Sequence, residues 1–126
     1  MNTYSCSIGG KDLVFEVGKY APQANAALTL TYGDTVVLAT ITRSPQAREG
    51  IDYFPLMVDY SEKLYAAGKI KGSRFIKKEG RPSDDAVANG RMVDRSLRPL
   101  FDQRIKEDVQ VILTVLSYDG ENSADV

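Results

Sequence analysis

The sequence predicts an α+β domain in which a single helix packs on one face of an antiparallel or mixed β-sheet. Three observations support this fold class. Apolar and polar residues alternate along much of the first half of the chain, and pairs of turn residues separate the alternating stretches. Residues 84–97 have helical periodicity instead, and an apolar strand pattern returns at residues 109–118. A chain of 126 residues, 43% hydrophobic and 26% charged, has room for one such domain.

Two β-hairpins are predicted near the N-terminus. Their strands are residues 4–8, 13–17, 28–32 and 35–42. Gly9-Gly10 lies within the first pair and Gly33-Asp34 within the second, and such dipeptides favour the tight turns that join antiparallel strands. β-Branched residues are frequent in the last of these strands, which fits a half-buried sheet surface.

A further strand is predicted at residues 53–60, after a loop at residues 43–50. The next segment, residues 61–81, carries several glycines among seven basic residues and shows no stable period. Structureless loops of this length are uncommon in a compact domain and are usually functional or mobile. We therefore expect residues 61–81 to form a long loop with a binding role.

A helix is predicted from residue 84 to residue 97 or slightly beyond. Ser83 is suited to cap its N-terminus, and Pro99 helps to end it. Asp84 and Asp85 in the first turn complement the helix dipole. At about 100° per residue, one apolar stripe is suited to face the sheet. This stripe consists of Ala86, Gly90, Val93, Leu97 and Leu100.

The chain ends in a strand and an acidic segment. The strand is predicted at residues 109–118, and Asn122, Ser123 and Asp125 resemble the capping residues of a further helix. We therefore expect one domain over residues 1–126 that is incomplete at its C-terminus. Missing elements would leave an apolar face or an edge of the sheet uncovered.

The formal net charge of -1 hides an uneven distribution of charge. Residues 63–106 contain twelve of the sixteen basic residues and five acidic ones, whereas the flanking segments are acidic. A solvated charged face is the usual explanation for such a run, but a contiguous basic block is also typical of a surface that binds polyanions. We favour a nucleic-acid or phosphate partner.

Composition excludes several reaction classes. The chain has no histidine, so it cannot build a Ser/His/Asp or Cys/His catalytic site, a histidine general base or a histidine-containing zinc site.

The single Cys6 cannot form an internal disulfide and is expected to be a small buried hydrophobe. Neither of the glycine motifs GxxxxGK[ST] and GxGxxG occurs. Because no membrane-span or signal-peptide pattern is present, we expect a cytoplasmic protein without membrane contact.

Arg91, Arg95 and Arg98 are predicted to lie along one side of the helix, nearly opposite the apolar stripe. Arginine is suited to bidentate recognition of phosphate, so we interpret these residues as contacts to phosphate groups or to an RNA backbone. The alternative is a solvated face on which Asp94 pairs with Arg98 four residues later. One acid cannot neutralise three arginines, which favours the phosphate interpretation.

The basic loop before the helix is a second candidate RNA contact. Its candidate residues are Phe75, Ile76, Lys77, Lys78 and Arg81. The cations would bind phosphates, while an aromatic ring among them is suited to stack on unpaired bases. Alternatively, Phe75 and Ile76 anchor the loop to the core. Tyr65 is a further candidate for base stacking.

The segment DYFPLMVDYSEKLYAAGKIKGSRFIKKEGRPSDDAVANGRMVDRSLRPLF resembles the first RNase PH-like domain of the bacterial polynucleotide phosphorylase (polyribonucleotide nucleotidyltransferase) family. The most specific parts are YAAGKI, FIKKEGRPS and DRSLRPLF, and the similarity extends over essentially the whole chain. The resemblance implies an RNase PH-like fold of the ribosomal protein S5 domain 2-like type.

The resemblance also implies a function for the full-length protein. It implies a homotrimeric ring that degrades single-stranded RNA from its 3′ end, using inorganic phosphate to release nucleoside diphosphates. Residues 75–78 would line the central aperture, and Arg91, Arg95 and Arg98 would lie near the active-site cleft. The phosphate-binding serines and metal-binding carboxylates belong to a second RNase PH-like domain. We therefore expect Mg²⁺ in the full-length enzyme but no catalytic residue and no metal ligand within this chain.

Two functions from different classes follow from these observations. We expect the RNA-binding N-terminal core of a phosphorolytic 3′-to-5′ exoribonuclease, inactive by itself. The alternative is a non-enzymatic scaffold or assembly module whose basic block contacts an acidic protein partner.

Overall fold

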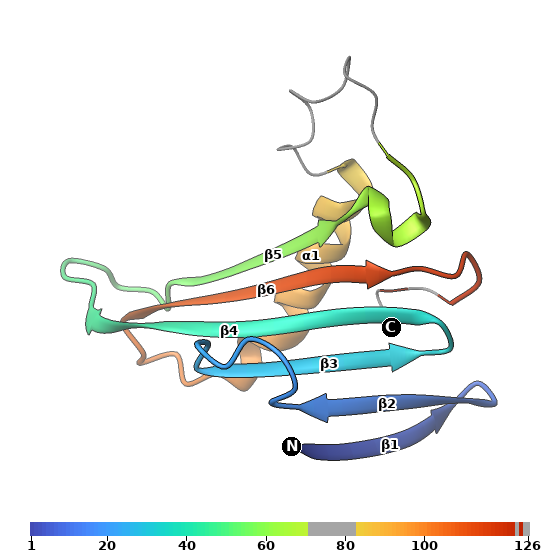
Figure 1. Cartoon of the computed structure of the whole chain (residues 1–126). Coiled ribbons are helices and arrows are strands. Elements are labelled where there is room, and N and C mark those ends of the chain that lie inside the picture. The colour runs from blue at the N-terminus through green and yellow to red at the C-terminus, as the bar shows by residue number, and fades with distance from the viewer. Residues whose placement is uncertain (71–82, 123, 125–126) are drawn as a thin grey trace.

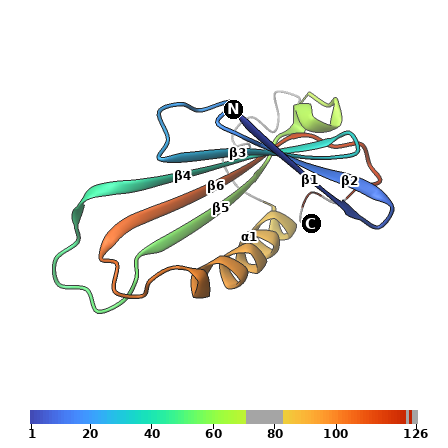
Figure 2. The ribbon, with the colours of Figure 1, turned by 90° about the horizontal axis from the view of Figure 1, so that it is seen from below.

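A computed structural model describes residues 1–70, 83–122 and 124 of the chain. The strands are β1 (Asn2–Ile8), β2 (Lys11–Val17), β3 (Ala26–Tyr32), β4 (Thr35–Ala47), β5 (Leu56–Glu62) and β6 (Glu107–Ser117). The helices are the 3₁₀ helix η1 (Leu64–Ala67), the α-helix α1 (Asp84–Leu97) and the 3₁₀ helix η3 (Arg98–Leu100). The strands form one sheet in the order β1-β2-β3-β4-β6-β5, with α1 on one face (Figures 1 and 2). The predicted α+β class with a mixed sheet is confirmed, because β5 and β6 pair in parallel.

Both N-terminal hairpins form as predicted. β1 pairs with β2, and β3 with the first half of β4, without a shift in register. Gly9 and Gly10 have φ angles of 59° and 79°, in the left-handed region that glycine adopts without steric cost. The prediction that Cys6 is buried is wrong, since its side chain is exposed on β1. β1 is an edge strand, so Cys6 has a neighbouring strand on one side only.

β4 extends to Ala47, well beyond its predicted end at residue 42. Its pairing with β6 shifts register between Arg43 and Ala47. Pro45 lies in this irregular stretch, where its missing N–H does not interrupt a regular ladder of hydrogen bonds. Most of the segment predicted as a loop at residues 43–50 therefore belongs to the sheet.

β5 begins three residues later than predicted, because Pro55 precedes it and the N–H of Leu56 donates to the carbonyl of Phe54 at 3.0 Å. The long loop predicted at residues 61–81 begins later than expected, since β5 continues to Glu62 and η1 follows. Gly68, with a φ of 69°, ends η1, and its N–H donates to the carbonyl of Tyr65 at 3.0 Å. The rest of that loop, residues 71–82, lies outside the described residues.

β6 lies between β4 and β5, although it is the last strand in the sequence. It is antiparallel to β4 and parallel to β5. A parallel pair requires a crossover connection, and α1 belongs to the connection between β5 and β6. Val109, Val111 and Val115 of β6 are buried and belong to the two hydrophobic clusters of the core.

α1 begins and ends where the sequence predicts. The hydroxyl of Ser83 accepts a hydrogen bond from the N–H of Ala86 at 3.1 Å, which confirms the predicted cap. Ala86 and Gly90 are buried, and a Cβ atom added to Gly90 would lie only 3.4 Å from the Cβ of Tyr60 on β5. Leu100, predicted to face the core, is instead 80% exposed. The chain leaves the α-helix for η3 at Arg98, and this changes the angle between successive side chains.

α1 packs against β5, and the same face of β1 to β4 has no described helix beneath it (Figure 2). Several apolar side chains of these strands line that face. They are Leu13, Val17, Leu28, Leu30, Val37, Ala39 and Ile41. The sheet therefore presents an apolar face of which only one part is covered by the residues that the structure describes.

A hydrogen-bonded turn after β6 fastens the C-terminal segment to the turn between β3 and β4. The carboxylate of Asp119 accepts hydrogen bonds from the backbone N–H groups of Glu121 and Asn122 at 2.9 and 2.8 Å. It also accepts one from the N–H of Asp34 at 3.1 Å. These bonds, with that of Asn122 foremost, hold the pKa of Asp119 well below its usual range. The buried hydroxyl of Thr35 donates to the carbonyl of Asn122 at 2.9 Å, which completes the attachment.

Replacement of Gly33 is expected to disrupt this attachment. Gly33 has a φ of 61°, and an added Cβ would overlap the side-chain amide of Asn122. Gly18, with a φ of 78°, has no atom within 4 Å of an added Cβ, so Gly18→Ala isolates the conformational cost of about 1 to 2 kcal/mol. Gly33→Ala should lower the free energy of unfolding, measured with urea, by at least twice as much. Equal losses in the two variants would show that the attachment contributes nothing.

The uncovered apolar face is expected to make the 126-residue chain self-associate at high concentration. Val17 lines this face and is 41% exposed, whereas Ser7 is exposed on the opposite face of the same hairpin. Val17→Lys should therefore shift the mass measured by light scattering towards the monomer, and Ser7→Lys, which adds the same charge, should not. A wild-type chain that stays monomeric at high concentration would contradict the expectation.

Candidate nucleic-acid interface

Arg91 in the middle of α1 and Arg95 in its last turn have no side-chain partner among the described residues. Arg91 and Arg95 are exposed and lie one helical turn apart, on the part of α1 that does not pack on β5. Within the described part of the chain, neither forms a hydrogen bond or a salt bridge through its side chain. Their guanidinium groups therefore remain available for phosphate, as the sequence predicts for their position on the helix.

Arg98 has a different environment from the other two arginines. Its guanidinium group binds both carboxylate oxygens of Asp94, with Nε–Oδ1 at 2.8 Å and Nη2–Oδ2 at 2.9 Å. It also donates to the carbonyls of Leu56 at 3.2 Å and Phe54 at 3.4 Å. The alternative pairing of Asp94 with Arg98 is thus present, and Arg98 joins the end of α1 to the start of β5.

The contact between Asp94 and Arg98 also fixes the charge of the pair. The hydrogen bond from Arg98 holds the pKa of Asp94 below its usual value, and the more distant charge of Arg91 acts in the same direction. The same hydrogen bond raises the pKa of Arg98. Asp94 thus remains ionised at neutral pH and compensates Arg98.

Most other cations of the described residues also have acidic partners. Arg43 binds Glu107 at 2.6 Å on neighbouring strands, and Arg104 binds Asp102 at 2.8 Å. The remaining pairs are Lys11 with Glu121, Lys19 with Glu16 and Arg48 with Asp108. Their positive charge is compensated within the chain, so they are poor candidates for a polyanion site.

Five described cations have no salt bridge to the described residues, and all five belong to the basic block predicted at residues 63–106. They are Lys63, Lys69, Arg91, Arg95 and Lys106. Lys63 and Lys69 flank η1, which follows the end of β5 (Figure 1). Sequence reasoning counted both lysines in the block but did not single them out. Their signal was a pair of cations on either side of an exposed aromatic residue.

The predicted loop contacts cannot be compared with the structure. Phe75, Ile76, Lys77, Lys78 and Arg81 all lie in residues 71–82, outside the described residues. The described segments on either side of them, η1 and the start of α1, lie at the same end of β5. Lys63, Lys69 and Arg91 therefore form the described part of the candidate interface, which we call the cationic end. Arg95 is a separate candidate, because it lies in the last turn of α1, close to the contacts of Arg98 with the start of β5.

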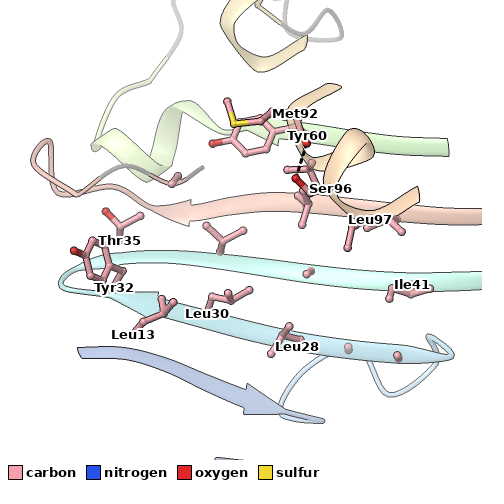
Figure 3. Close-up of a pocket in the computed structure, with 18 of the residues that line it drawn as sticks. Leu13, Leu28, Leu30, Tyr32, Thr35, Ile41, Tyr60, Met92, Ser96 and Leu97 are labelled. Carbon is pink, nitrogen blue, oxygen red and sulfur yellow. Dashed lines mark hydrogen bonds between the residues drawn. The ribbon is translucent and has the colours of Figure 1, made fainter. Parts of the chain in front are cut away.

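A groove of about 500 Å³ lies on the helix-bearing face of the sheet, between α1 and strands β2 to β4. Figure 3 shows that mainly apolar side chains line it, with few hydroxyl groups among them. The hydroxyl of Ser96 donates to the carbonyl of Met92, and that of Tyr32 to the carbonyl of Ile8. None of the described residues that line the groove is charged, so this lining is unsuited to bind phosphate and differs in chemistry from the cationic end.

The described residues do not assemble a metal site. No group of three or more carboxylate or cysteine side chains is arranged to hold a metal ion among them. The acidic residue with the most unusual environment, Asp119, is occupied by backbone N–H groups. The helices in this part of the chain are too short or too polar to cross a membrane.

Residues 9–126 match the model of the 3′ exoribonuclease family, domain 1. The chain belongs to the 3′ exoribonuclease family. The predicted relation to the RNase PH-like domain is therefore confirmed, and the match includes α1, η1 and all of the cationic end.

Curated relatives of this chain share about half of its residues. It is 49% identical over 125 residues to the polyribonucleotide nucleotidyltransferase of Dehalococcoides mccartyi and 52% identical over 123 residues to that of Caldicellulosiruptor saccharolyticus. These matches cover 99% and 98% of the chain but only 17% of each relative. The chain thus spans about a sixth of the length of these relatives.

Solved structures confirm the fold. The chain superposes on rice Rrp46 with a TM-score of 0.60 at 18% identity, over 85% of the chain and 47% of that protein. It superposes on a chain of the Archaeoglobus fulgidus exosome with RNA bound to the active site, with a TM-score of 0.65 at 18% identity. That match covers 86% of the chain and 44% of the exosome chain. At this level of identity the similarity establishes an RNase PH-like fold.

Loss of the carboxylate at position 94 is expected to weaken the link between α1 and β5. Asp94→Asn should lower the free energy of unfolding at pH 7 by about 0.3 to 1 kcal/mol, since the pair is partly exposed. The pKa of Asp94 is lowered by folding, so its stabilising effect is present above the ordinary aspartate pKa of about 3.9 and is lost as pH falls. Urea unfolding measures the free energy of unfolding of both proteins at pH 7 and at pH 3. The difference between wild type and variant should be smaller at pH 3.

Asp102→Asn is the matched control for this measurement. Asp102 also pairs with an arginine, but Arg104 is 91% exposed and joins no other element. Its replacement should leave the unfolding free energy unchanged. A loss at pH 7 that is the same for both variants would show that Arg98 does not depend on Asp94 for its contacts with β5.

Proposed function

We propose that this chain is the RNA-holding N-terminal part of a polyribonucleotide nucleotidyltransferase, a phosphate-dependent 3′-to-5′ exoribonuclease of RNA turnover. The observation that carries the proposal is the identity of about 50% with enzymes of that name over nearly the whole chain. The unpaired cations at the cationic end support a role in holding the RNA strand.

The proposed reaction requires a held strand. An oxygen atom of inorganic phosphate attacks the phosphorus of the last phosphodiester bond, and the bond from that phosphorus to the 3′ oxygen of the preceding nucleotide breaks. The products are a nucleoside diphosphate and an RNA shortened by one nucleotide. Arg91 and Arg95 would bind phosphodiester groups near this end, because guanidinium groups match the paired oxygens of a phosphodiester.

The proposal assigns the chemical step to parts of the protein outside this chain. The described residues bring no set of carboxylates together that would fit Mg²⁺, so no step through that ion is derived from them. Inorganic phosphate as co-substrate, assembly as a homotrimer and action in the cytoplasm belong to the same proposal. Arg98 would act indirectly, by fixing the end of α1 that carries Arg95.

Replacement of the free arginines tests the RNA-holding role. The chain should bind oligo(A) with a slope of log K against log salt of about −2 to −4. Arg91→Ala and Arg95→Ala should each weaken binding, measured by fluorescence anisotropy, and reduce the magnitude of that slope by about 1. Arg104→Ala removes an exposed arginine that is already paired with Asp102 and should change neither quantity.

Two outcomes would contradict the proposal. The first is an absence of oligo(A) binding at low salt, or binding that does not depend on salt. The second is that the arginine variants bind RNA normally but lose self-association, because this result would favour a scaffold that meets an acidic protein surface. Lys77→Ala with Lys78→Ala separates the same two functions, through loss of RNA affinity or loss of assembly.

A further inference from the structure

We propose that η1 and the end of β6 form a base-stacking site for single-stranded RNA, with Tyr65 and Tyr118 as its stacking surfaces. The inference rests on the proposed function, and it adds a second kind of contact to that function. Arg91 and Arg95 would hold the backbone by charge, whereas the two tyrosines would hold unpaired bases by contact between ring faces.

Backbone hydrogen bonds hold the two tyrosines at one corner of the fold. The N–H of Tyr118, directly after β6, donates to the carbonyl of Ala66 in η1 at 3.0 Å. Ala66 is 9% exposed and packs in the hydrophobic core, which anchors η1 to the sheet. The N–H of Lys69 donates to the carbonyl of Leu64 at 3.0 Å and closes η1 at its end. Tyr65 and Tyr118 are therefore carried by a short, fastened element.

The side chains at this corner are more exposed than a structural role requires. Tyr65 is 59% exposed and Tyr118 is 44% exposed, and Ile70 nearby is 97% exposed. Within the described residues neither tyrosine ring pairs with another aromatic ring or with a cation. A ring that anchored η1 to the core would be buried, as Ala66 is. Both rings thus have free surface for a planar ligand.

The charge around the corner favours a nucleic acid over an apolar protein surface. Lys63 and Lys69 flank η1, are exposed, and have no salt bridge to the described residues. Glu62 precedes Lys63 and Asp119 follows Tyr118, but the carboxylate of Asp119 already accepts three hydrogen bonds from backbone N–H groups. Aromatic rings among unpaired cations are the combination that binds single strands without sequence preference, because every base has a stacking face and every nucleotide a phosphate.

The stacking site and Arg91 lie close enough for one strand to reach both. Gly90, next to Arg91, packs on Tyr60 of β5, and Tyr65 follows only five residues later in the chain. Five residues span at most about 17 Å. Figure 1 shows η1 and the first turns of α1 at the same end of β5. A strand of a few nucleotides bound at Arg91 could therefore place a base against Tyr65.

Three substitutions separate stacking from charge. Tyr65→Ala and Tyr118→Ala should each weaken the binding of oligo(A) by about 5- to 150-fold, with no change in the slope of log K against log salt. Tyr65→Phe keeps the ring and should bind as the wild type does. Tyr4→Ala is the matched control, since Tyr4 is 61% exposed but lies on β1, at the opposite edge of the sheet from β5.

A fluorescent reporter measures stacking directly. The chain contains no tryptophan, so Tyr65→Trp introduces a single indole at the proposed site. Its emission should be quenched by oligo(A) and not by an abasic oligonucleotide of the same length, although both carry the backbone charge.

The outcomes distinguish this inference from the proposed function. Normal affinity in both tyrosine-to-alanine variants, or equal quenching by the abasic strand, would overturn the stacking site and leave the RNA-holding role intact. Failure of the wild-type chain to bind oligo(A) at low salt would overturn both. If the tyrosine variants instead change the mass measured by light scattering while binding RNA normally, the corner is a protein contact and the inference is wrong.

Discussion

The insertion of β6 between β4 and β5 is the constraint on which the rest of the structure depends. The last strand of the chain pairs on both sides, antiparallel with β4 and parallel with β5. The parallel pair requires a connection that crosses one face of the sheet, and α1 is the described helix of that connection. Because α1 packs on β5 through Ala86 and Gly90, Arg91 and Arg95 are left in solvent. Within the described residues, most of the apolar face of β1 to β4 has no helix packed on it.

The availability of each arginine depends on the oxygen atoms within its reach. Arg98 has Asp94 one turn earlier on α1 and two carbonyl groups at the start of β5, so four hydrogen bonds engage it. Both oxygens of Asp94 accept hydrogen bonds from Arg98, and Arg91, three residues before Asp94, forms no salt bridge with it. Arg95 has Arg91 one turn before it and Pro99 one turn after it, so no acid lies at either position. A single aspartate thus divides three arginines, spaced by four and three residues, into one structural residue and two without a described partner.

Local signals in the sequence predicted the hairpins and α1, because these elements depend on neighbours in the chain. Gly9-Gly10 and the cap at Ser83 act within a few residues, and both form as predicted. The errors arise where distant contacts decide the structure. Leu100 is exposed because the α-helix changes to η3 before it. Arg98 donates hydrogen bonds to carbonyl groups more than forty residues earlier in the chain. η1 was not predicted, because a hydrogen bond from the N–H of Tyr118, far beyond it in the sequence, fixes its position.

A stacking corner near Arg91 fits the proposed function, in which the enzyme shortens RNA one nucleotide at a time. Such an enzyme must hold every sequence and must release the strand by one step after each cleavage. Phosphate contacts and stacking contacts both meet this requirement, because neither depends on the identity of the base. A pocket with directed hydrogen bonds to one base edge would hold that base and oppose the next step. The exposure of Tyr65 and the absence of described acceptors around Arg95 are therefore consistent with contacts that form and break repeatedly.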